Sequence, residues 1–340
     1  MEYKDLYTPD ALKRAFDRAM AGNRKNSEFT WYKTHRMEAI DSISDKLMCR
    51  AYYPKPLRTF KVYEPKEREV QAPSIADKIV QNAMLDEGLY LALTRPFIRD
   101  TYGSMIGRGT LDGLDRMKHF MAQSWRIYGP ECSVLKGDIH HFFASIDRND
   151  AAKKARKQIE DDEIFELLLR YLNAFDGGLP LGLRTSQPLA NLVLNNMDHY
   201  IKESLGCRWY GRYMDDFYII HPDRDFLRHA RERIEAGLSG MGLSLNNKTH
   251  IFPIQHGIDF LGFRTYMTDT GKVIRKVMEQ SRRGMGRRLH HFRDLYLAGV
   301  MTEEDIRMHY QSWRAHADHG NSRGLILKYD AKVEEIFKGG

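Results

Sequence analysis

The chain of 340 residues contains 53 lysines and arginines against 46 acids, which gives a formal net charge of +7 at pH 7, and 42% of its residues are hydrophobic. This composition excludes a disordered chain, and the length accommodates two or three compact units. The apolar runs are too short to span a membrane, and the N-terminal MEYKDLYTPDALKRAF lacks the apolar core of a signal peptide, so we expect a cytoplasmic protein without membrane contact.

The first elements alternate between helical and stranded patterns. Apolar residues recur at helical spacing over residues 1–50, which predicts amphipathic helices. Residues 51–74 alternate aromatic and aliphatic residues with basic ones and contain four prolines, a pattern typical of short strands joined by turns. Helical spacing returns over residues 74–94 and 109–128, and no internal repeat is present.

The segment SVLKGDIHHFFASIDR, residues 133–148, places one acid at the end of an apolar strand. Val134, Leu135 and Ile139 bracket Asp138. A carboxylate delivered by the end of a strand is held rigidly, as a metal ligand must be. An aspartate that caps the turn after the strand is the alternative interpretation, and both remain open at this point.

The segment GRYMDDFYIIH, residues 211–221, places two adjacent acids inside an apolar run. Burial of Asp215 and Asp216 is unfavourable without a positive partner, because each carboxylate loses solvation and the two repel each other. The pair could instead occupy the tip of a hairpin, where aspartate is common. A nearby cation would explain why both acids are kept.

Asp138 and the Asp215–Asp216 pair together favour a metal site. Both lie at the ends of apolar strands, and the three carboxylates meet if these strands are neighbours in one sheet. Hard oxygen ligands suit magnesium, which retains water and phosphate oxygens in its other positions. Two such ions activate an attacking hydroxyl and stabilise the leaving oxygen in a phosphoryl transfer.

The segment RKVMEQSRRGMGRRLHHFR, residues 275–293, carries most of the local positive charge. Only Glu279 opposes the cations. A charged, solvated helix face is one interpretation, and a surface that follows a polyanion is the other. The cations are Arg275, Lys276, Arg282, Arg283, Arg287, Arg288 and Arg293.

The sequence YMDD at residues 213–216 resembles the active-site motif of reverse transcriptases. The order of the surrounding segments is similar to that family from about residue 58 to 264, including LKGDIHHFFASID, GLPLGLRTSQPLANLVLNNMD and GIDFLGFR. The resemblance implies an α+β, right-hand polymerase fold with a palm built on an antiparallel sheet. It implies fingers over residues 1–132, a palm over 133–265 with an insertion at about 149–180, and a helical thumb over 266–340.

The resemblance also assigns roles to the acids. It implies that Asp138 and Asp215 ligate two magnesium ions, for which manganese can substitute, and that Asp216 supports this site. The carbonyl of Ile139 would complete one coordination sphere. Lys248 matches the position of a proton donor to the leaving pyrophosphate, although a surface lysine after two asparagines would look the same.

Nucleotide and nucleic-acid contacts follow from the same resemblance. Arg68, with Lys66 or Lys61, matches the cations that hold the triphosphate. Phe143 matches a steric gate against the ribose 2′-hydroxyl, with a core phenylalanine as the alternative. The implied nucleotide contacts also include Leu181, Gly182 and Gln187, and the implied contacts to the nucleic acid are Phe260, Leu261, Gly262, Arg275, Lys276, Arg282, Arg283, Arg287 and Arg288.

Two departures from the family pattern favour a particular branch. Leu181-Gly182 and Ser186-Gln187 stand where many reverse transcriptases have Gln-Gly and Ser-Pro. These pairs and the tail SWRAHADHGN resemble enzymes of diversity-generating retroelements and related antiviral defence systems. The loss of the glutamine amide predicts an error-prone or template-selective polymerase. The chain after residue 293 is too short for a ribonuclease H domain, so we expect none.

The expected partners are an RNA template, a DNA primer and product, and deoxynucleotides. By resemblance, a dedicated non-coding RNA and a small helical accessory protein or second subunit are also expected. The alternative function is an RNA-binding scaffold whose polymerase site is weak or vestigial.

Overall fold

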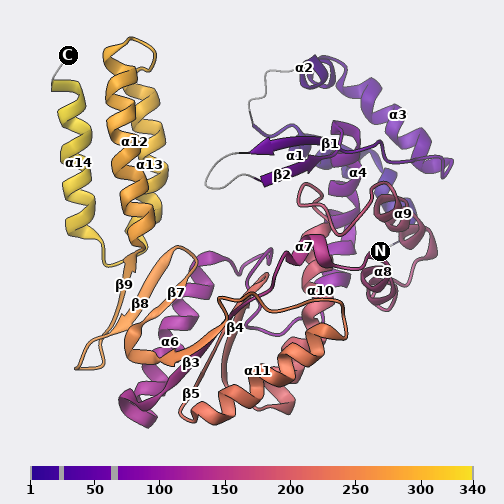
Figure 1. Ribbon diagram of the computed structural model, residues 1–340. Helices are drawn as coiled ribbons and strands as arrows, with labels where there is room; N and C mark the ends of the chain where they lie inside the picture. Colours follow the sequence, from indigo (N-terminus) through magenta and orange to yellow (C-terminus); the bar gives the residue numbers. More distant parts are fainter. Residues whose placement is uncertain (1, 23–26, 63–67, 339–340) are drawn as a thin grey trace.

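The computed structural model describes residues 2–22, 27–62 and 68–338. Figure 1 shows N-terminal helices and a hairpin at the upper right, three C-terminal helices at the upper left, and a four-stranded sheet below them. This mixture of helices with antiparallel sheets confirms the predicted α+β class. Within the described residues, no helix combines the length and apolar character that crossing a membrane requires.

The N-terminal helices form because their apolar residues share one face. In α1, Pro9 occupies the first helical position and the Thr8 hydroxyl accepts a hydrogen bond from the Ala11 N–H at 3.3 Å. The buried face of α1 packs against α4. The helices before the sheet are η1 (Tyr3–Tyr7), α1 (Pro9–Ala19), α2 (Ser27–Thr34), α3 (Arg36–Met48), α4 (Ile75–Met84), η2 (Leu85–Leu89), α5 (Tyr90–Thr94) and α6 (Thr110–Tyr128). Their positions confirm the predicted helical segments.

A hairpin of β1 (Arg58–Val62) and β2 (Arg68–Ala72) confirms the strands predicted within residues 51–74. The two strands pair antiparallel along their whole length. Lys61 lies in β1, and the backbone of Arg68 begins β2, although its side chain lies outside the described part of the structure. Lys66 also lies outside the described residues.

The central sheet brings distant parts of the chain together. Its strand order is β4–β5–β3–β6, and every neighbouring pair is antiparallel. One face belongs to the core that contains α10 and α11, while the other face packs with α6 and the second sheet. The elements are β3 (Ser133–Asp138), α10 (Ser186–His199), β4 (Trp209–Tyr213), β5 (Asp216–His221), α11 (Arg224–Ser239) and β6 (His250–Pro253).

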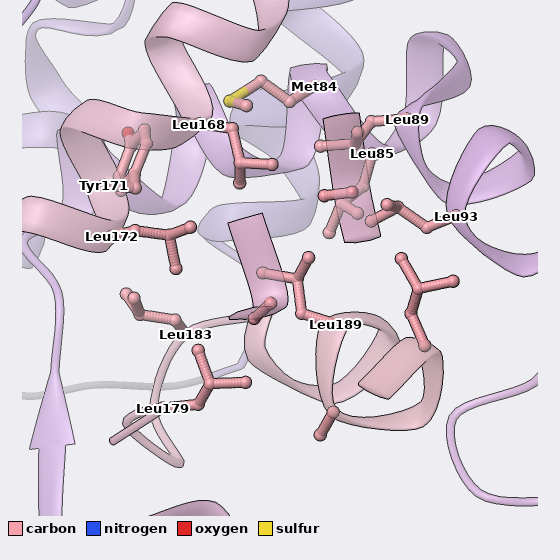
Figure 2. Close-up of a cluster of buried hydrophobic side chains, with 14 of the residues drawn as sticks. Met84, Leu85, Leu89, Leu93, Leu168, Tyr171, Leu172, Leu179, Leu183 and Leu189 are labelled. Atoms are coloured by element: carbon pink, nitrogen blue, oxygen red, sulfur yellow. The ribbon is translucent and has the colours of Figure 1, made fainter. Parts of the chain in front are cut away.

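Three helices connect β3 to α10, and the second and third fall in the segment of the predicted insertion at about 149–180, whereas the first precedes it. They are α7 (Phe142–Ser145), α8 (Arg148–Arg156) and α9 (Asp162–Asn173). Figure 2 shows Leu168, Tyr171 and Leu172 of α9 facing Met84 and the leucines of η2 and α5 across one apolar cluster. This cluster joins the N-terminal helices to the segments that flank the sheet.

The C-terminal part begins with a second antiparallel sheet and continues into three helices. The elements are β7 (Ile258–Phe260), β8 (Phe263–Met267), β9 (Val273–Val277), α12 (Glu279–Leu297), α13 (Glu303–Asp318) and α14 (Arg323–Lys338). The boundary predicted between residues 265 and 266 falls inside β8. The helices of the predicted thumb therefore begin at Glu279.

Candidate active site

The turn between β4 and β5 carries Asp215, and its backbone is strained at the preceding residue, Met214. Tyr213 ends β4 and Asp216 begins β5, so only Met214 and Asp215 connect the two strands. Met214 has a φ of +56°, in the left-handed region that residues other than glycine rarely adopt. Such a conformation costs about 1–3 kcal/mol and persists only where the surroundings enforce it.

A buried arginine enforces this turn. The guanidinium of Arg212 is completely buried and donates a hydrogen bond to the Met214 carbonyl at 2.7 Å. It also donates to both carboxylate oxygens of Asp198, at 2.7 and 2.5 Å, and to the side-chain oxygen of Asn191 at 2.8 Å. Asp198 and Asn191 both belong to α10. The turn is therefore fixed to α10 by a bidentate ion pair, a contact that the sequence analysis missed.

The end of β3 lies beside the same turn. Asp138 is directly opposite Asp216 in the β3–β5 register, and the Ile139 N–H donates to the Asp215 carbonyl at 3.2 Å. Burial raises the pKa of Asp215, and the neighbouring Asp138 carboxylate raises it further. Asp138 and Asp215 thus form a pair of acids that a bound cation would stabilise in the ionised form.

Lys136 is the positive group that the structure places nearby. Its ammonium pairs with the Asp216 carboxylate and lies 5.4 Å from the centre of the Phe260 ring. Burial lowers the pKa of Lys136 to about 8, against the opposing effect of the Asp138 and Asp215 carboxylates. The two-residue period of β3, which puts Lys136 on the same face as Asp138, is a signal that could have revealed it.

Asp216 meets Lys136 as well as the other predicted carboxylates, since it lies opposite Asp138 in the sheet. Among the residues that the structure describes, no group of three histidine, cysteine or acidic side chains is arranged to hold a metal. Asp216 is directed to Lys136, which leaves Asp138 and Asp215 with the Ile139 backbone beside them. Two carboxylates still fit magnesium, which commonly takes one or two carboxylates and completes its shell with water and substrate phosphates.

Lys248 lies on a loop that is attached to the end of β3. The Asn246 N–H donates to the Asp138 carbonyl at 2.7 Å, and the His140 N–H donates to the Ser244 carbonyl at 2.9 Å. Lys248 follows two residues later, and its side chain is exposed. These hydrogen bonds hold the loop that carries Lys248 beside the end of β3, where Asp138 lies. The role of proton donor and the alternative of a surface lysine both stay predictions.

The segment before α10 forms the wall of a cleft beside the turn. Leu181, Gly182 and Gln187 line this cleft of about 980 Å³ together with Tyr213. The Leu181 residue is 42% exposed to solvent. Phe143 does not line the cleft: its ring is partly buried and meets Phe142 edge to face, with 5.4 Å between the ring centres. The structure therefore brings three of the predicted nucleotide contacts together next to the strained turn.

The residues that form this candidate site lie within a segment that matches a known protein family. Residues 58–265 match the family described as Reverse transcriptase (RNA-dependent DNA polymerase). The matched region is more than half of the chain and includes Asp138, Asp215 and Asp216. The chain belongs to the reverse transcriptase family.

Two similar proteins illustrate the range of the family. Protein YkfC of Escherichia coli (strain K12) is 26% identical over 279 residues, which cover 66% of this chain and 70% of YkfC. A structure of telomerase from Candida albicans, in complex with a TWJ fragment of telomeric RNA, is 15% identical with a TM-score of 0.51. That similarity covers 84% of this chain but only 57% of the telomerase chain. It shows the fold and confirms the right-hand polymerase architecture.

Gly182 packs closely against the β1–β2 hairpin. A Cβ atom added at Gly182 would lie 1.5 Å from the Gln71 carbonyl oxygen in β2, a distance that only a shift of the backbone could relieve. We predict that Gly182→Ala displaces the β1–β2 hairpin and lowers kcat/KM for deoxynucleotides by about 10²-fold, as a displacement of about 1 Å can do. Steady-state kinetics would test this.

Gly237, on the exposed side of α11, has no atom within 4 Å of an added Cβ and provides the matched glycine control. Gly237→Ala should leave the same kinetics near those of the unmodified protein. Equal kinetics for Gly182→Ala would show that the hairpin does not depend on this close approach.

The predicted thumb contacts divide into exposed and buried groups. Arg275 is only 6% exposed, and its guanidinium donates to Asp115 at 2.8 Å, so its predicted contact with nucleic acid is corrected. The ring of Phe260 is also buried, which leaves Leu261 and Gly262 in the β7–β8 turn as the accessible part of that motif. The remaining cations are exposed: Lys276, Arg282, Arg283, Arg287 and Arg288.

Proposed function

We propose that the protein synthesises DNA on an RNA template. The observation that carries this proposal is the meeting of Asp138 with Asp215 on a strained turn that a buried arginine fixes, within a reverse transcriptase domain. The 3′-hydroxyl of a primer would attack the α-phosphate of a deoxynucleotide, and pyrophosphate would leave. The new bond joins the 3′-oxygen to the α-phosphorus as the bond from that phosphorus to pyrophosphate breaks, and the hydroxyl proton is released, so the extended primer, pyrophosphate and the proton together account for all atoms of the reactants.

Magnesium, or manganese in its place, is the cofactor that these residues suit. Asp138 and Asp215 would hold it with the Ile139 carbonyl, while Asp216 supports the site through Lys136. Two bound ions would supply the positive charge that activates the hydroxyl and stabilises the leaving oxygen. The raised pKa of Asp215 supports this assignment, because the acids are held together without an equal number of protein cations beside them.

The other predicted residues would bind and orient the substrates. Phe143 would exclude a ribose 2′-hydroxyl, Leu181, Gly182 and Gln187 would border the nucleotide and template base, and Arg68 with Lys66 would hold the triphosphate. Lys248 would give a proton to pyrophosphate. The exposed thumb cations are Lys276, Arg282, Arg283, Arg287 and Arg288, and they would follow the phosphates of the template–product duplex.

We further propose that the template is a dedicated non-coding RNA, copied in a diversity-generating retroelement or an antiviral defence system in the cytoplasm. Leu181-Gly182 and Ser186-Gln187 support this branch. A small helical accessory protein or a second subunit would assist, by resemblance to that branch.

Purification with any RNA that remains bound tests the function directly. Magnesium and labelled deoxynucleotides would be added, and both the bound RNA and the product would be sequenced, with Asp215→Ala as the inactive control. DNA complementary to one stretch of a single RNA would support a dedicated reverse transcriptase. A tightly bound RNA without any product would instead favour the RNA-binding scaffold.

Leu181 offers a test of fidelity. Its exposed aliphatic side chain replaces an amide at the border of the nucleotide cleft, so one polar constraint on the incoming base is absent. We predict that Leu181→Gln lowers misincorporation about fivefold, which corresponds to about 1 kcal/mol for one added hydrogen bond. Sequencing of complementary DNA from a defined template would measure the change. An unchanged error frequency would show that Leu181 does not set fidelity.

A further inference from the structure

The nucleotide cleft continues into two further hollows that lead away from the catalytic turn. It shares Tyr90, Leu91, Ile106 and Arg108, among others, with a second hollow of about 1010 Å³. That hollow in turn shares Lys157 and Gln158 with a third hollow of about 860 Å³ beside α8. Because neighbouring hollows share lining residues, the three follow one another from Tyr213, next to the turn, to α8 and α9, and we call this series of hollows the groove.

The charge of this groove suits a polyanion. Nine cationic residues line it against five acids. The far end is the most positive, because the last part of α8 and the residue after it contribute Lys153, Lys154, Arg156 and Lys157, whereas Asp150 is the acid in that hollow. Lys153 and Lys157 are exposed. Cations at a helix C-terminus also interact favourably with the helix dipole. That effect explains the cations of α8 but not why they line a hollow that adjoins two others.

The groove also offers surfaces for unpaired bases. Leu91 and Ile106 are 69% and 78% exposed where the first two hollows meet, beside the partly buried Tyr90. In the third hollow, the Arg156 guanidinium lies over the Phe165 ring, 5.2 Å from its centre. The other residues that line this hollow include Asn149, Asn195, Asn196 and Gln158. Aromatic faces and backbone-tracking cations are the usual combination for single-stranded nucleic acid.

We propose that this groove binds single-stranded RNA, the part of the template that has not yet been copied. This inference rests on the proposed function for the direction of the strand, since the groove begins at Leu181, Gly182 and Gln187, where the template base would lie. A template that enters along α8 passes Arg95 and Arg108 before it reaches the turn. In this arrangement the protein binds its RNA template both beside Asp138 and Asp215 and along the groove that leads away from them.

Equilibrium binding of two labelled substrates tests the groove without any need for catalysis. Each substrate is a DNA primer annealed to an RNA template that extends beyond the primer as a single-stranded 5′ overhang. The overhang is about one nucleotide long in the first substrate and about twelve in the second, a length within the site sizes of single-strand-binding proteins. The unmodified protein should bind the long overhang more tightly. Lys153→Glu with Lys157→Glu should remove most of that gain, about tenfold at low salt, and should lower the salt slope by about 1.4, at about 0.7 for each lost phosphate contact.

Arg228→Glu with Arg233→Glu on α11 changes the net charge equally on exposed residues outside the three hollows. This control should keep the gain from the long overhang. The proposed role of the groove would be overturned if the unmodified protein bound both overhangs with equal affinity. It would also be overturned if the variant with Lys153→Glu and Lys157→Glu still bound the long overhang more tightly. Primer extension on the same substrates reports separately on the proposed function, so a protein that binds in this manner but does not extend would contradict only the latter.

Discussion

Asp215→Asn is expected to lower the rate of nucleotide addition by about 10³-fold or more. The substitution removes one of the two carboxylates that would hold the divalent cations, whose stabilisation of the transition state is worth several kcal/mol, and about 1.4 kcal/mol corresponds to tenfold in rate. Single-turnover primer extension at saturating deoxynucleotide would measure the loss.

The fold should survive this change. Burial and the Asp138 carboxylate raise the pKa of Asp215, so its ionised form is disfavoured in the folded protein, and a neutral amide relieves the repulsion. The melting temperature without divalent cations should therefore be equal or higher. Asp269→Asn, in the exposed β8–β9 turn, is the matched control and should retain full activity. Comparable activity in Asp215→Asn would exclude Asp215 as a metal ligand.

Arg212→Met is expected to destabilise the protein by about 3–5 kcal/mol, because it leaves the Asp198 carboxylate buried without its cation. From the described part of the chain, Asp198 then keeps the hydroxyls of Tyr210 and Thr101, which donate to it at 2.5 and 3.2 Å. The Met214 carbonyl also loses its donor, so the strained turn is no longer enforced. Urea denaturation would measure the free energy of unfolding.

A double-mutant cycle separates the ion pair from simple loss of packing. Arg212→Met combined with Asp198→Leu removes both charges and should be less destabilising than the sum of the two single changes. Arg212→Lys keeps the charge but not the bidentate fork, so we expect a folded protein with a reduced kcat and a nearly unchanged KM for the primer. Additive single effects in the cycle would show that Arg212 and Asp198 are not coupled.

Local sequence patterns were enough to predict the helices, the strands and the acids of the candidate site. Helices over residues 1–50, 74–94 and 109–128 and strands around Asp138 and Asp215 follow from local apolar spacing, which depends on neighbours in the chain. The adjacent acids Asp215 and Asp216 in an apolar run also predicted a cation-binding site, because burial of a charge is unfavourable without a partner of opposite charge. The family pattern then fixed the order of the motifs.

Which charged side chains meet depends on how the folded chain packs. Arg212 and Asp198 are 14 residues apart and completely buried as a pair, whereas Lys136 pairs with Asp216, which lies opposite Asp138 in the sheet. Arg275, which composition assigned to the nucleic-acid surface, is instead buried against Asp115 from a segment 160 residues away. A charged side chain has no local preference for one partner, so its pairing and burial depend on the packing of sheets and helices that local spacing does not specify.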